Sequence, residues 1–143
     1  MTIGVDIMIK YTEEKTFTQD QVQELFKSVG WILAEYPQRL HKALMNSRTV
    51  LTAWDGERLV GLARVLDDSE LVAFVHYVLV HPEYQGQKIA GNMVEYIRDK
   101  YKNYLYIDGM PEDSKNVAFY ERHGFHFMEG GTPIQIYNFS DKR

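Results

Sequence analysis

Apolar residues in the first part of the chain recur at helical spacing. Thr18 and Gln21 stand in the arrangement of a capping box, which starts a helix by satisfying its first free N–H groups. The apolar positions that follow are three or four residues apart: Val22, Leu25, Phe26 and Val29. Gly30 can adopt the left-handed conformation that ends a helix. A second helix is predicted from Pro37, because a proline at the first helical position loses no hydrogen bond.

Short β-branched and aromatic runs predict strands between turn residues. The runs are Ile7–Tyr11, Thr49–Trp54, Arg58–Leu66, Phe74–Val80, Tyr104–Ile107, Phe125–Phe127 and Ile134–Phe139. The Asp55-Gly56 pair after the second run is a hairpin turn signal. Helical patterns over 89–101 and from Ser114 to about His123 complete the set. The order predicts an α+β fold, with a mixed sheet of six to seven strands flanked by about four helices.

The run Phe74–Val80 is nearly all apolar, which is the pattern of a central strand covered on both faces. This strand, the helix after it and Tyr104–Ile107 should form a right-handed crossover, so the two strands should be parallel. Alternation along the first strand should place one set of side chains on a common face: Phe74, His76, Val78 and Val80.

Composition narrows the class of protein. The chain has 143 residues, and we expect a single domain over residues 1–143 with one well-buried core. It contains no cysteine, which excludes disulfides, thiolate metal ligands and a cysteine nucleophile. The net charge of −4 disfavours nucleic-acid binding, which needs a basic face. No apolar run approaches the roughly 20 residues that span a bilayer. The N-terminus lacks a signal-peptide pattern, so we expect no membrane association and a cytoplasmic location.

The central stretch 75–101 combines a buried strand, a polar loop and a helix. Free N–H groups and the positive dipole end at a helix start favour phosphate binding. The loop Gln85–Ala90 is similar to Gln/Arg-x-x-Gly-x-Gly/Ala, the acyl-CoA signature of the GNAT N-acetyltransferases. Lys88 stands where that signature has glycine, which permits a positive φ. A lysine there can still offer its N–H to a phosphate if φ is negative and its side chain points outward, and we expect CoA binding to be retained.

Two further stretches carry the resemblance to the GNAT family. Residues 78–82, Val-Leu-Val-His-Pro, are similar to the family's central strand and its exit. Residues 116–125 are similar to its late helix, with Phe-Tyr-x-x-x-Gly-Phe intact. The element order is also that of the family, and the resemblance covers most of 49–127. The position of His76 shows some likeness to the arylalkylamine N-acetyltransferase branch.

The resemblance implies that acetyl-CoA is the co-substrate and that no metal takes part. The pantetheine arm would pair with the strand at Val78, Leu79 and Val80, in the gap where two parallel strands part. The pyrophosphate would lie on the loop and the helix start, at Gln85, Gly86, Gln87, Lys88, Ile89, Ala90 and Gly91. Asn116 and Phe119 of the late helix would complete the cofactor site.

Amine acetylation needs alignment, a neutral amine, stabilisation of the developing oxyanion and a proton for the leaving thiolate. The resemblance implies that Tyr120 supplies that proton, and a phenol with a pKa of about 10 suits a thiolate whose conjugate acid is near 8.5. The alternative is a core tyrosine on an amphipathic helix. His76 is the candidate base, since an imidazole with a pKa of about 6.5 can take a proton from the amine. A hydrogen-bonded core histidine is the alternative.

Trp31 and Tyr36 fall where the family builds its acceptor wall, although both can equally seal the core over the first helix. The predicted function is direct acetyl transfer to a primary amine of a small molecule. Peptide or protein N-acetylation and a non-catalytic acyl-CoA sensor are the alternatives. A nucleotide-binding protein ranks lower because the P-loop and dinucleotide motifs are missing. The run Ile134–Phe139 offers an edge through which two copies could form a homodimer. The identity of the acceptor amine is not readable from the sequence.

Overall fold

The computed structural model of the chain describes residues 8–111 and 115–139. They fall into two compact units, one ending at Gly109 and the other beginning at Met110. The expectation of one domain over residues 1–143 stays a prediction, and each unit is described by itself. Among the described residues, no helix is long and apolar enough to cross a membrane.

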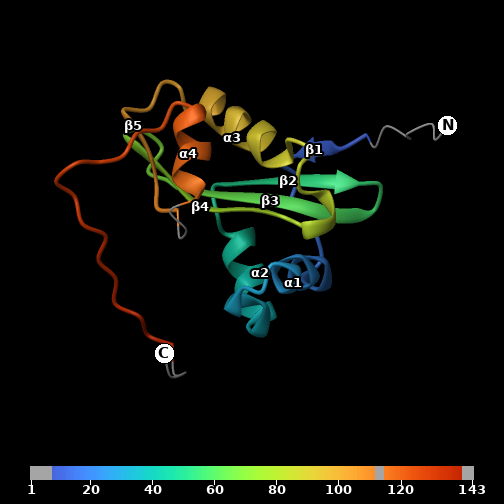
Figure 1. Cartoon of the computed structure of the whole chain (residues 1–143). Coiled ribbons are helices and arrows are strands. Elements are labelled where there is room, and N and C mark those ends of the chain that lie inside the picture. Colours follow the sequence, from blue (N-terminus) through green and yellow to red (C-terminus); the bar gives the residue numbers. More distant parts are fainter. Residues whose placement is uncertain (1–7, 112–114, 140–143) are drawn as a thin grey trace. The chain divides into compact units, whose positions relative to one another are not determined.

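The first unit is built on a five-stranded sheet whose spatial order follows the chain, β1-β2-β3-β4-β5 (Figure 1). The strands are β1 Lys10–Thr12, β2 Thr49–Asp55, β3 Arg58–Asp67, β4 Val72–Val80 and β5 Tyr106–Gly109. The first four strands are antiparallel to their neighbours, and β5 lies parallel to β4. The predicted hairpin at Asp55-Gly56 and the predicted parallel crossover are therefore confirmed.

Helices cover both faces of this sheet (Figure 1). One face carries α1 Gln19–Ser28, the 3-10 turn η1 Ile32–Glu35 and α2 Pro37–Met45. Their apolar residues pack with those of the central strands into one buried cluster, which includes Phe26, Leu44, Val50, Leu62 and Leu79. The other face carries α3 Ile89–Lys100, which follows the short 3-10 turn η2 Pro82–Tyr84. The approach of α3 to the sheet is close, since a Cβ added to Gly61 of β3 would lie 3.1 Å from Ile89.

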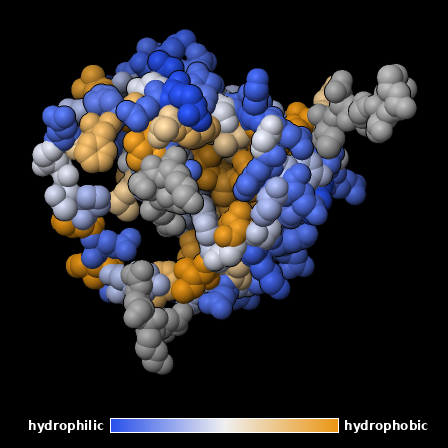
Figure 2. Space-filling view, viewed as in Figure 1, coloured by the Kyte–Doolittle hydropathy of each residue, from blue (hydrophilic) through white to orange (hydrophobic). Residues whose placement is uncertain are grey.

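The start and end of α1 follow from local signals in the sequence. The Thr18 side chain accepts from the N–H of Gln21 at 3.1 Å, and the Gln21 side chain accepts from the N–H of Thr18 at 2.8 Å. Gly30 ends the helix with a φ of +73°. Between these caps Val22, Leu25 and Phe26 are buried. Polar residues predominate over the β1 and α1 side of the molecule in Figure 2, as expected for a helix with one buried face.

A β-bulge in β4 changes which side chains share a face. Arg64 of β3 pairs with Tyr77 and Val65 pairs with Val75, so His76 is an extra residue without a partner on β3. The extra residue puts His76 and Tyr77 on the same side, and their ring centroids lie 4.0 Å apart. That side is the α1 face, where the Tyr77 and Phe26 rings meet at 5.4 Å.

The bulge makes one sequence expectation wrong. Val78 is paired with Ala63 and Val80 with Gly61, and Gly61 faces α3. Directly opposed residues in an antiparallel pair share a face, so Val78 and Val80 lie on the α3 face. They do not share a face with Phe74 and His76, because strict alternation holds only in a strand without a bulge.

A polar network lies at the end of the first unit where β2 begins and β3 ends. The Tyr101 hydroxyl donates to Asp67 at 2.7 Å and lies 2.7 Å from the Thr49 hydroxyl. The Asp67 side chain is only 1% exposed, and Arg48 lies 3.4 Å from its carboxylate. The network joins the end of α3 to the ends of β2 and β3, so it holds the crossover against the sheet.

The second unit contains α4 Lys115–Arg122, which agrees with the predicted late helix apart from the predicted cap Ser114, which lies outside the described residues. Gly124 ends this helix with a φ of +92°. The predicted strands Phe125–Phe127 and Ile134–Phe139 are not strands in the structure. The described residues thus hold five strands rather than six to seven. Ile134 is 93% exposed and Ile136 is 87% exposed, so an alternating pattern there does not produce a buried strand face.

Candidate active site

The loop between β4 and α3 exposes the start of a helix. Residues 85–88 are exposed, and α3 begins at Ile89 without any side chain capping its N-terminus. Its first turn contains no acidic residue. The contrast with α1 is direct, since Thr18 and Gln21 cap that helix. The first N–H groups of α3 therefore lack a side-chain acceptor, and together with the helix dipole they favour an anion such as a pyrophosphate.

Two residues of this loop have a left-handed backbone. Gly86 has a φ of +85° and Lys88 has a φ of +64°. The condition of a negative φ at Lys88 is therefore not met. Lys88 adopts the conformation that a glycine would adopt without strain, because the chain must turn sharply there to start α3. The loop thus has a left-handed residue at the position where the GNAT signature has glycine, although the residue there is a lysine.

The strand β4 loses its partner on one side halfway along. Its pairing with β5 runs from Val72 and Tyr106 to Val75 and Gly109. From His76 onward, β4 is paired with β3 alone among the described strands. This part includes Val78, Leu79 and Val80, the predicted pantetheine contacts, and an extended amide chain could pair with such an edge. The Val80 carbonyl, at the end of this part of β4, accepts a hydrogen bond from the Gln85 side chain at 3.4 Å.

His76 stands at the point where β4 and β5 part. Its Nδ1 lies 2.6 Å from Nη1 of Arg64. A guanidinium has donors only, so Nδ1 accepts and the proton of the neutral ring is on Nε2. Although the residue is exposed overall, burial of the ring, followed by the charge of Arg64, lowers the pKa of His76 to about 4. A pKa near 6.5, which the role of base required, is therefore not what this environment gives.

Arg64 is the residue of this site that sequence reasoning missed. It lies in β3 and is half-buried, with buried neighbours on both sides in the chain. Its Nε donates to the Ser47 hydroxyl at 2.8 Å, and its guanidinium lies 5.5 Å from the centre of the Tyr77 ring. The signal that could have found it is a charged residue inside the otherwise apolar stretch 59–66.

Trp31 belongs to the wall of the core on the same face. Its ring lies 5.7 Å from those of Phe26 and Tyr77. It is partly buried and packs against the main apolar cluster, as the core-sealing alternative expected. Tyr36 is also partly buried and immediately precedes α2. Trp31 therefore contacts Tyr77, which is next to His76 in the chain. A role in an acceptor wall stays a prediction for Trp31 and for Tyr36.

The remaining predicted residues lie in the second unit. Tyr120 and Phe119 are partly buried residues of α4, and Asn116 is exposed on the same helix. The Tyr120 ring packs edge-on against Phe119 at 5.1 Å and Phe125 at 5.5 Å. Burial raises the pKa of Tyr120, so its phenol keeps its proton at neutral pH.

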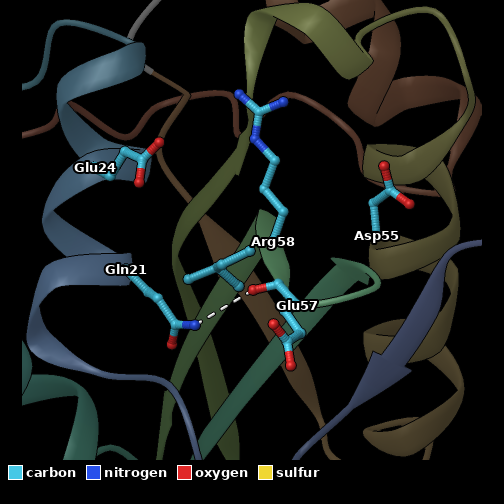
Figure 3. A pocket seen from close by; sticks show the side chains of 6 residues that line it. Gln21, Glu24, Asp55, Glu57 and Arg58 are labelled. Carbon is cyan, nitrogen blue, oxygen red and sulfur yellow. Dashed lines mark hydrogen bonds between the residues drawn. The ribbon is translucent and has the colours of Figure 1, made fainter.

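A polar hollow lies between α1 and the β2–β3 hairpin (Figure 3). Its lining includes Glu24, Asp55, Glu57 and Arg58, and the Gln21 amide donates to the carbonyl of Glu57 at 3.4 Å. Three carboxylates against one guanidinium repel an anion, so this hollow does not suit the phosphates of a cofactor. The uncapped start of α3 does.

Comparison with known proteins agrees with this geometry. The sequence model of the acetyltransferase (GNAT) family matches residues 13–125. The chain belongs to the GNAT family. A GNAT family acetyltransferase from Streptococcus pneumoniae is 28% identical, with a TM-score of 0.78 over 92% of this chain and 100% of that one. A probable acetyltransferase from Staphylococcus aureus is 24% identical, with a TM-score of 0.81 over 92% and 100%.

One curated relative of this GNAT chain is an uncharacterized N-acetyltransferase ycf52-like protein from Prochlorococcus marinus. It is 30% identical over 91 residues, which are 61% of this chain and 50% of that protein. The chain thus spans half the length of this relative. The predicted GNAT-type fold is confirmed, and the predicted enzyme class, an acyltransferase, is confirmed at the level of the family. The likeness to the arylalkylamine branch is not shown by these comparisons.

Proposed function

We propose that this GNAT protein transfers the acetyl group of acetyl-CoA directly to a primary amine of a small molecule. The observation that carries the proposal is the parting of β4 from β5 after Val75, on the strand whose following loop leads to the uncapped start of α3. An open strand edge followed by free helical N–H groups suits a ligand with an amide arm and a pyrophosphate.

The pantetheine arm and the pyrophosphate of acetyl-CoA each have a chemical match in the first unit. The amides of the pantetheine arm would pair with backbone groups of Val78, Leu79 and Val80. The pyrophosphate would accept from the N–H groups of 85–91, with the exposed Lys88 side chain adding a positive charge. When bound, the thioester supplies an activated acetyl group, so the protein has only to align the amine and manage the protons.

In this proposal Tyr120 gives its proton to the leaving thiolate. Its raised pKa keeps the phenol protonated, which is the state that an acid requires. Tyr120→Phe keeps the ring packing and removes only the hydroxyl. We expect turnover to fall about 10²- to 10⁴-fold while acetyl-CoA affinity stays unchanged. Unchanged turnover, with chemistry shown to limit the rate, would refute the role.

We assign to His76 a different part from that of a strong base. With a pKa of about 4 it is neutral at physiological pH, and its Nε2–H is a hydrogen-bond donor. It can orient the amine or the thioester oxygen next to the gap, and the amine then loses its proton to water. A pH–rate profile that His76→Gln shifts near pH 6.5 would contradict this assignment and restore the base.

The experiment that tests the function is release of CoA in the presence of acetyl-CoA and a panel of primary amines, including peptides with free N-termini. Thermal shifts with acetyl-CoA, ATP and NAD form the binding arm, because a ligand that binds only the folded state raises its apparent stability. Stabilisation by acetyl-CoA alone, with turnover of at least one amine, is the expected result. Binding without turnover of any amine would favour the sensor alternative. The homodimer and the cytoplasmic location stay predictions.

A further inference from the structure

The Arg64 guanidinium is a half-buried cation without an acidic partner. No carboxylate of the described residues lies within 4.0 Å of its nitrogens, although Arg48, Arg58 and Arg98 each have such a partner. Its neighbours are a hydroxyl, an imidazole and an aromatic ring, all neutral. Burial lowers the pKa of Arg64, which is the sign of a cation held where its charge is poorly compensated.

Only part of the hydrogen-bonding capacity of Arg64 is used. Of the five N–H groups, Nε–H donates to Ser47 and one Nη1–H donates to His76. No described side-chain nitrogen or oxygen is both buried and without a hydrogen-bond partner. The Tyr77 side chain also contributes a hydrogen bond to the guanidinium, so three neighbours share its five donors. Arg64 is only partly buried, and we take its remaining donors to be available to a ligand.

The guanidinium is held in place by its neighbours. The Ser47 hydroxyl donates to the Ala43 carbonyl at 2.7 Å, so it can accept from Arg64. Ser47 is only 2% exposed, and the ring of Tyr77 lies against the guanidinium on another side. A fixed guanidinium with donors left over suits a planar anion, because less side-chain entropy is lost when the ligand binds.

The position of Arg64 relates this edge to the reaction. Its Nη1 contacts His76, the first β4 residue beyond the pairing with β5. One imidazole ring thus separates the free cation from the gap where the acetyl group is expected. An acceptor that binds Arg64 with an anionic group and presents an amine at the gap must be compact.

We propose that the acceptor is a small zwitterion, a primary amine that also carries an anion, and that Arg64 binds the anion. The chemistry favours a carboxylate, because the remaining guanidinium donors can serve its two oxygens. A phosphate monoester presents the same acceptor chemistry with more charge. The inference rests on the proposed acetyl transfer and deepens it by naming the substrate class.

The test compares matched acceptors on the full chain. β-Alanine and its amide form one pair, and phosphoethanolamine and ethanolamine form the other. Rates are compared at equal concentrations of neutral amine, and binding in the presence of CoA is measured separately by calorimetry. We expect kcat/KM for the carboxylate to exceed that for its amide by about 10- to 100-fold, the usual worth of a hydrogen bond to a charged group. A larger ratio for the phosphate pair would assign phosphate as the anion.

Variants then connect the preference to Arg64. Arg64→Gln should abolish the preference mainly through KM, and Arg64→Lys should restore part of it. Arg98→Gln is the control, because it removes the same charge from an exposed residue of α3. If anionic and neutral acceptors react and bind equally in the native protein, or if Arg64→Gln keeps the preference, the inference is overturned while acetyl transfer stands. Should no amine react, the proposed function fails, and unequal binding of acid and amide would still support the anion site.

Discussion

Lys88 holds a backbone conformation that costs free energy to a residue with a side chain. Its φ is +64°, and it directly precedes α3. An L-residue in the left-handed region is less stable by about 1–2 kcal/mol, and glycine avoids this cost. Glycine also makes the unfolded chain more disordered, which takes back about 0.5–1 kcal/mol. The change Lys88→Gly should therefore raise the free energy of unfolding by about 0.5–1 kcal/mol, or roughly 2 °C in melting temperature.

Two matched variants separate backbone strain from charge. Lys88→Ala removes the charge but keeps a Cβ in the same conformation, so stability should stay within about 0.5 kcal/mol of the native value. Gln87→Gly places the glycine one residue earlier, where φ is not positive, and should lower stability by about 0.5–1 kcal/mol. The assay is urea denaturation followed by tryptophan fluorescence, read as the shift in midpoint at constant slope.

The result that would refute the reasoning is an equal loss of stability in Lys88→Gly and Gln87→Gly. That outcome would mean that residue 88 has a negative φ in solution. Binding of acetyl-CoA gives a second readout. The backbone N–H groups remain in every variant, so affinity should fall alike in the two Lys88 variants if the side chain contributes charge. It should not change at all if the backbone alone binds the pyrophosphate.

Three further predictions concern the first unit. Tyr101→Phe removes one hydrogen bond to the buried Asp67 carboxylate, which keeps the Ser69 N–H as a donor, so chemical denaturation should show a loss of about 1.5–3 kcal/mol, whereas a loss below about 0.5 would contradict the network. Gly61→Ala places a Cβ 3.1 Å from Ile89 and should lower stability by about 1–3 kcal/mol, with an unchanged melting temperature as the refuting result. The folded state binds a proton on His76 only near pH 4, while the unfolded chain binds one near about 6.5. Stability should therefore be lost as pH falls between these values, and His76→Gln should make that fall shallower in denaturation curves measured across the range.

The sequence predicted best what short-range chemistry determines. The capping box at Thr18 and Gln21, the end of α1 at Gly30 and the turn at Asp55-Gly56 each depend on a few adjacent residues, and all three are confirmed. The crossover from β4 to β5 was also predictable, because chain handedness leaves few alternatives. These elements were enough to place the loop before α3 at the end of a central strand.

The errors concern what depends on a partner segment. A bulge is a property of two paired strands, so the order of residues around His76 could not show that it joins the side of Tyr77. The run Ile134–Phe139 alternates as a strand does, but alternation does not supply an edge to pair with. Arg64 was missed for the same reason, since its partners Ser47 and His76 come from other elements.

The bulge also bears on how this site could change. His76 is the residue of β4 that has no counterpart on β3, so the pairing on either side of it does not depend on its presence. Deletion of His76 would give a regular β3–β4 pairing and would leave Val75 and Tyr77 on the faces that they occupy now. Deletion of another β4 residue would move every side chain beyond it to the opposite face of the sheet. The residue at the mouth of the gap is thus an insertion in the sheet. Reaction chemistry at this position can be exchanged or lost while the core beneath it keeps its register.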